Sequence, residues 1–132
     1  MIIKQYPLVT LSTEPDSNIV FMEFRPNLKV DLQEAREIVS NRLEFTRNRK
    51  HFLILDVTNV RRLTAEDKVF MQRPETGMKN ILGAAFTAGN PVAALLANIF
   101  IKTPKNFHAR FFTNREAAVA WIEQYKLKML IE

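Results

Sequence analysis

The 132-residue sequence contains no cysteine, three glycines and two histidines. Without cysteine, disulfides, thiol catalysis and thiolate metal sites are excluded. Three scattered glycines build no glycine-rich phosphate loop, and no serine lies in a nucleophile-elbow context. His51 and His108 have no second ligand at metal spacing, so we expect them on the surface or in a strand ladder. The sequence therefore predicts a non-enzymatic protein that holds no metal and no cofactor.

Long apolar runs are also missing. The longest, Val92–Ala97, is far shorter than a membrane span, and Met1–Pro7 lacks the apolar core of a signal peptide. We therefore expect a cytoplasmic protein without a membrane span. The length is that of a single domain over residues 1–132, with residues 126–132 as a possible extension.

Basic residues outnumber acidic ones, with 19 against 14 and a formal net charge of +5. They are scattered along the chain, and no predicted element carries a basic face interleaved with aromatic side chains. Charge of this kind influences solubility and nonspecific contacts. The sequence favours a mildly basic solvated surface over a specific nucleic-acid interface.

β-like segments recur between stretches of turn and helix character. Leu8–Thr13 and Ile19–Phe24 flank turn residues and predict an antiparallel hairpin at the amino terminus. Phe52–Val57 is a nearly continuous apolar run, which predicts a central parallel strand buried on both faces. Further strands are expected at Ile81–Thr87 and Phe107–Phe112.

The first two predicted helices begin at capping residues. Asp31 begins a helix with one mostly apolar stripe, and this helix ends near residues 47–49. Thr64 begins a short second helix, which Pro74 and Gly77 end.

Two more helices are expected further along. Asn90 and Pro91 begin a third, which runs to about Lys102. A capping box of Thr113 and Glu116 begins the last. The sequence thus predicts an α/β fold with a mostly parallel five-stranded sheet flanked by helices.

Four short stretches, at residues 53–60, 89–92, 98–100 and 110–113, carry a resemblance to a known family. They resemble STAS domains, the fold of sporulation anti-anti-sigma factors, and in particular a SpoIIAA-like branch of small bacterial proteins. The resemblance implies that fold and a role in protein interaction. In regulatory STAS domains a phosphorylated serine caps the helix after the central strand. Here the matching stretch, Leu63-Thr64-Ala65-Glu66, has no serine. We therefore interpret Thr64 as a helix cap and not as a phosphorylation switch.

Polar residues at the predicted strand ends and helix starts should converge on one rim of the sheet, where α/β proteins bind ligands. The candidate rim residues are Asp56, Thr58, Thr64, Thr87, Asn90, Thr113 and Asn114. Exposed helix amides there could hold an anion or a partner's acidic side chain. Ordinary helix capping explains the same residue types, and for Asp56 the sequence favours a role in organising the turn that follows it.

The predicted third helix has more apolar residues than one sheet-facing stripe requires. The second stripe consists of Ala93, Ala97, Phe100 and Ile101. It can form a self-association surface, lie under neighbouring loops, or line a pocket. The sequence favours a homodimeric protein-interaction domain whose protein partner is unknown. The alternative is a domain that binds a small apolar ligand or lipid, and a third possibility is an enzyme that uses Asp56.

Overall fold

The structure, a computed structural model, describes residues 1–63, 65–90 and 109–131. Its main sheet has six strands in the order β1-β2-β3-β5-β7-β8, namely β1 (Ile2–Gln5), β2 (Val9–Thr13), β3 (Ile19–Phe24), β5 (His51–Asp56), β7 (Ile81–Thr87) and β8 (Ala109–Phe112). The pairs β1–β2 and β2–β3 are antiparallel, whereas β3, β5, β7 and β8 run parallel to one another. The predicted amino-terminal hairpin, β2–β3, and the mostly parallel α/β sheet are confirmed.

The described part of the chain contains three strands that the sequence did not predict. β1 adds a sixth strand to the sheet and is tied to the first helix, since Lys4 Nζ lies 2.8 Å from Glu44 Oε1. β4 (Leu28–Val30) and β6 (Val60–Leu63) form a separate parallel pair. The expectation of five strands was wrong because these segments of three or four residues are too short to show a strand period.

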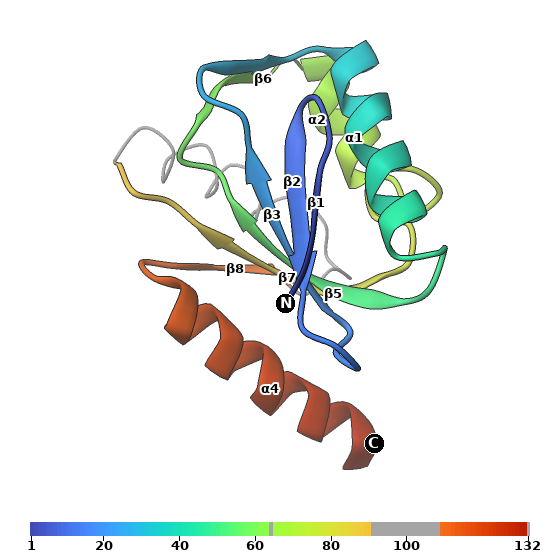
Figure 1. The fold of residues 1–132 in the computed structure, drawn as a ribbon, viewed down its shortest axis with the longest axis vertical. Coiled ribbons are helices and arrows are strands. Elements are labelled where there is room, and N and C mark those ends of the chain that lie inside the picture. Colours follow the sequence, from blue (N-terminus) through green and yellow to red (C-terminus); the bar gives the residue numbers. More distant parts are fainter. Residues whose placement is uncertain (64, 91–108, 132) are drawn as a thin grey trace.

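Helices cover both faces of the main sheet (Figure 1). α1 (Leu32–Phe45) and α2 (Ala65–Gln72) lie on one side, and α4 (Arg115–Ile131) lies on the other. Each face has its own apolar cluster: Leu53 and Leu55 of β5 belong to the cluster that includes Ala35 and Ile38 of α1. Phe52 and Ile54 belong to the cluster that includes Ala118 and Ile122 of α4. The central strand is therefore buried on both faces, as its apolar run predicted.

The residue that caps α1 is the one predicted from the sequence, whereas the residue that caps α4 is not. Asp31 caps α1, with its Oδ1 accepting the Glu34 amide at 3.1 Å. At α4 the cap is Asn114, whose Oδ1 accepts the Ala117 amide at 2.8 Å. The predicted cap at Thr113 was wrong by one residue, because asparagine caps at least as well as threonine.

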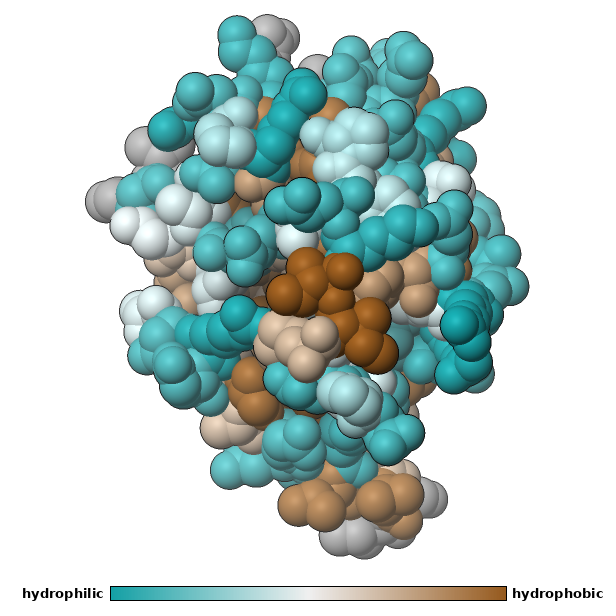
Figure 2. All heavy atoms as spheres, viewed as in Figure 1, coloured by the Kyte–Doolittle hydropathy of each residue, from teal (hydrophilic) through white to brown (hydrophobic). Residues whose placement is uncertain are grey.

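The carboxyl-terminal segment is helical as well. Residues 126–131, predicted as a tail, continue α4, because leucine, lysine and methionine favour a helix. Leu127, Met129 and Leu130 are exposed, so these side chains do not add to the core. Figure 2 shows apolar surface at the far end of α4, apart from a second apolar group in the middle of the same face. Ile2 and Ile3 of β1 are also exposed.

Three predictions lie outside the described residues: the Thr64 cap, the helix from Asn90–Pro91 to Lys102, and its second stripe of Ala93, Ala97, Phe100 and Ile101. Within the described ranges, no helix combines the length and apolar character that crossing a bilayer needs.

A polar pair at the amino end of β5 was not anticipated. His51 is 2% exposed and Arg42 of α1 is 1% exposed. Of the two positions that the sequence allowed for His51, the strand ladder is the one observed, since His51 begins β5 and pairs with Ile81 of β7.

Candidate functional site

The parallel strands end in register along one edge of the sheet. Glu23 of β3 pairs with Asp56 of β5, Asp56 pairs with Thr87 of β7, and Thr87 pairs with Phe112 of β8. Because parallel neighbours in register present their side chains on the same face, this row places two carboxylates and a hydroxyl side by side. The edge is the carboxyl end of the strands, where α/β sheets bind their ligands.

Asp56 organises the turn that follows β5. Its Oδ1 accepts hydrogen bonds from the Thr58 amide at 3.0 Å and from the Thr58 hydroxyl at 2.5 Å. An aspartate that bonds to the backbone two residues ahead forms an Asx turn. The turn-organising role considered for Asp56 from the sequence is therefore present in the structure.

Thr58 links this turn to the segment after β7. Its Oγ1 accepts the Gly89 amide at 2.7 Å, and its carbonyl oxygen accepts the Asn90 side-chain amide at 3.2 Å. A Cβ on Gly89 would lie 3.3 Å from Thr58 Oγ1, which is a tight contact, so glycine at this position allows the two loops to approach each other. The chain Asp56–Thr58–Gly89 thus joins two loops into one polar unit.

The start of α4 forms the other side of the site. The Arg115 guanidinium lies 3.6 Å from the centre of the Phe21 ring, which is cation–π geometry. Since Asn114 caps the same helix, this arginine stands in the first turn next to the helix amides. The site therefore combines carboxylates from the strand ends with one cation from a helix start.

These groups enclose a half-open pocket of about 190 Å³, which we call the carboxyl-end pocket. Five of the seven predicted rim residues line it: Asp56, Thr58, Thr87, Thr113 and Asn114. Asn90 does not line the pocket but donates to the Thr58 carbonyl oxygen, and Thr64 lies outside the described residues.

Two charged lining residues were missed from the sequence. Glu23 closes the apolar run of β3 just as Asp56 closes that of β5, a signal that the sequence carried but that was used only for Asp56. Arg115 follows the helix cap, and its packing on Phe21 joins residues 94 positions apart, which no local pattern reveals.

The chemistry available to the carboxyl-end pocket is that of polar recognition. Its titratable lining groups are Glu23, Asp56 and Arg115. Asp56 already accepts two hydrogen bonds at Oδ1, and the pocket's hydroxyls come from threonines. Among the described residues, no group of three or more histidine, aspartate or glutamate side chains has the arrangement of a metal site.

Comparison with known families identifies the chain. Residues 13–126 match the family described as Domain of unknown function (DUF7793), so the chain belongs to that family. A search of curated proteins found no match.

Among solved structures, the chain is similar to an uncharacterised protein of the DUF3478 family with a SpoIIAA-like fold, from Shewanella loihica PV-4. The TM-score is 0.58 at 12% identity, over 86% of this chain and 90% of that one. At this identity the likeness shows the fold, and the SpoIIAA-like fold expected from the sequence is confirmed.

Proposed function

We propose that this domain is a non-enzymatic protein-interaction module that contacts its partner through the carboxyl-end pocket and the loops around it. One observation supports this role above the others. The Asp56–Thr58–Gly89 hydrogen-bond chain fixes two loops against each other at the strand ends. A surface that is fixed before binding loses little conformational entropy when a partner docks.

The charges of the pocket suit recognition rather than catalysis. Asp56 Oδ1 accepts two hydrogen bonds from Thr58 that shape the turn, while the exposed Arg115 lies over the Phe21 ring, where its charge can meet an incoming carboxylate. Glu23 and Arg115 together offer a partner one site for a cation and one for an anion.

The alternative role, binding a small apolar ligand, receives less support from this pocket. Ligand pockets commonly enclose about 300–1,000 Å³ and are mostly apolar. The carboxyl-end pocket encloses about 190 Å³, and its lining includes two carboxylates, three threonines and an arginine.

Self-association completes the proposal. The second apolar stripe of residues 91–102 (Ala93, Ala97, Phe100 and Ile101) supports a homodimer, since a two-fold interface uses the same patch twice. The absence of cysteine is compatible with a cytoplasmic location.

Native mass spectrometry together with light scattering separates the two roles. The proposal predicts a dimer without a bound apolar ligand, and Phe100→Glu should dissociate it, because two carboxylates would be buried together. Unchanged circular dichroism of this variant would show that the fold persists. A monomer that copurifies with a stoichiometric fatty acid would instead support the apolar-ligand role.

A further inference from the structure

A second hollow lies at the opposite end of the parallel strands, between the β2–β3 turn and the loop that joins α1 to β5. It is a half-open cavity of about 500 Å³, which we call the amino-end pocket. This volume falls within the range of about 300–1,000 Å³ that is common for small-molecule sites. The proposed function does not use it.

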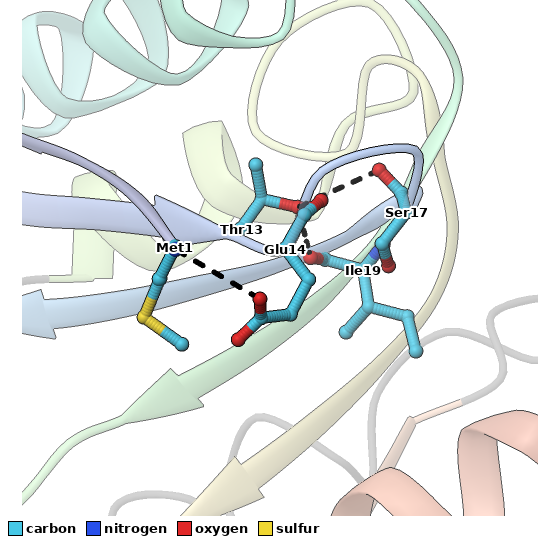
Figure 3. A network of polar contacts seen from close by, with 5 residues as sticks. All are labelled: Met1, Thr13, Glu14, Ser17 and Ile19. Atoms are coloured by element: carbon cyan, nitrogen blue, oxygen red, sulfur yellow. Dashed lines mark hydrogen bonds and ion pairs between the residues drawn. The ribbon is translucent and has the colours of Figure 1, made fainter.

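Cations predominate in the lining of the amino-end pocket. Arg47, Arg49 and Lys50 come from the α1–β5 loop, and the facing carboxylates are Glu14 and Asp16. The Glu14 carboxylate lies 4.0 Å from the ammonium group of Met1, as Figure 3 shows. The lining therefore contains three cationic side chains and two carboxylates, and the Glu14 carboxylate already lies next to the ammonium group of Met1.

The loop that carries the cations is held in a fixed shape. Arg47 and Asn48 have φ angles of 54° and 58°, a region that side-chain-bearing residues seldom adopt. The Asn80 side-chain amide donates to Asn48 Oδ1 at 2.7 Å and to its carbonyl oxygen at 3.2 Å. His51 Nδ1 donates to Arg49 O at 2.8 Å. The Arg47 amide donates to Glu44 O at 3.1 Å and the Asn48 amide to Leu43 O at 2.9 Å, so these left-handed residues close the carboxyl end of α1. The loop is therefore held by α1, by Asn80 and by His51.

The opposite wall is fixed as well. Thr13 Oγ1 donates to Ile19 O at 2.8 Å, and Ser17 Oγ accepts the Ile19 amide at 3.1 Å (Figure 3). Val20 and Phe45 add apolar surface to the same pocket. The cavity therefore has a basic side and an apolar side, both formed before any ligand binds.

We propose that the amino-end pocket binds a small phosphate ester, with its phosphate on Arg49 and Lys50 and its organic part against Val20 and Phe45. The planar guanidinium group matches phosphate oxygens through paired, charge-assisted hydrogen bonds. Lysine adds a compact positive charge. A neutral ligand would leave this basic side unused, and an inorganic anion would leave the apolar side uncovered.

Amide NMR titrations of the full chain test this site with phenyl phosphate, pyrophosphate and the neutral benzyl alcohol. Phenyl phosphate should give saturable shifts at residues 13–18 and 46–51, with tighter binding than pyrophosphate, while benzyl alcohol should leave these amides unshifted. The double variant Arg49→Gln, Lys50→Gln should weaken phenyl phosphate binding at least about tenfold, which corresponds to about 1.4 kcal/mol.

Lys29→Gln is the matched control, because Lys29 is an exposed lysine of β4 that does not line the pocket. It should bind phenyl phosphate as the wild type does. The proposal is overturned if phenyl phosphate gives no saturable shifts in the millimolar range, if pyrophosphate binds as tightly, or if Lys29→Gln loses as much affinity as the double variant. Spectra of both variants that otherwise match the wild type show that each is folded.

Discussion

Arg42 Nη1 donates a hydrogen bond of 2.9 Å to His51 Nε2, and both side chains are buried. Since a guanidinium can only donate, Nε2 accepts, and the proton of the ring sits on Nδ1, which donates to Arg49 O at 2.8 Å. Arg42 also donates to Lys79 O at 2.8 Å and to Gly77 O at 3.1 Å. The pair therefore joins α1, the start of β5 and the loop before β7, with a neutral histidine at its centre.

The neutral state of His51 makes stability dependent on pH. Burial lowers the pKa of His51 from 6.5 to about 4, the Arg42 charge acts in the same direction, and the bond to Arg49 opposes both. Between these two pKa values the unfolded chain binds more protons than the folded one, so stability falls as pH falls below 6.5. We expect unfolding at pH 5 to need about 2 kcal/mol less than at pH 7.5, measured by urea denaturation.

His51→Gln provides the control for this pH effect, because glutamine does not titrate. The variant should be less stable than the wild type at pH 7.5, and the gap between them should narrow at pH 5. Parallel pH profiles for the two proteins would assign the effect to other groups.

Replacing Arg42 should destabilise the fold strongly. Arg42→Met keeps the aliphatic bulk but leaves Gly77 O, Lys79 O and His51 Nε2 without their donor, and we expect a loss of at least about 2 kcal/mol. The control is Arg36→Met on the same helix, where an exposed guanidinium lies over the Phe70 ring and the loss should stay below about 1 kcal/mol. Equal losses in chemical denaturation would refute the structural role of Arg42.

Leu55 tests the burial of the central strand. Leu55→Ala should cost about 2–5 kcal/mol, because it opens a cavity in the apolar cluster beneath α1. Val69→Ala, at a position on α2 that is 51% exposed, should cost less than about 0.5 kcal/mol. Thermal or urea unfolding measures both, and a loss below half a kcal/mol at Leu55 would place it at the surface.

Thr58 tests the link between the two loops of the carboxyl-end pocket. Thr58→Val keeps the shape but removes the hydroxyl that donates to Asp56 and accepts from Gly89, so we expect a loss of about 1–3 kcal/mol. Amide exchange at Gly89 should also accelerate. Thr58→Ser retains the hydroxyl and should protect the Gly89 amide as the wild type does; if valine protects it equally, the hydrogen bond has no structural role.

Local patterns in the sequence were sufficient for the main strands, for the cap at Asp31, for the turn at Asp56 and for five of the residues that line the pocket. Each depends on neighbours in the chain: an apolar run, a capping spacing, or a polar residue where a strand ends. The convergence of Asp56, Thr87 and Thr113 follows from parallel strands alone, since their carboxyl ends share one edge.

The features that were missed depend on contacts between distant segments. Arg42 occupies an apolar helix stripe, and its burial becomes understandable only with the carbonyls of Gly77 and Lys79, 35 and 37 residues away. Gly77 has a related reason to be glycine, because a Cβ there would collide with the backbone of Met71. The Asn80 side-chain amide likewise binds the α1–β5 loop at Asn48, 32 residues away.

Photo-crosslinking in cells that naturally express the protein tests the central claim, that the carboxyl-end pocket engages a protein partner, most directly. A photoreactive residue at Thr113, which is exposed and lines the pocket, should yield one discrete adduct with a different protein, identified by mass spectrometry. The same residue at Lys29 of β4, which is exposed away from the pocket lining, should not yield it. Failure to detect an adduct at Thr113 above the level at Lys29, or an adduct only with a second copy of this chain, would contradict the account.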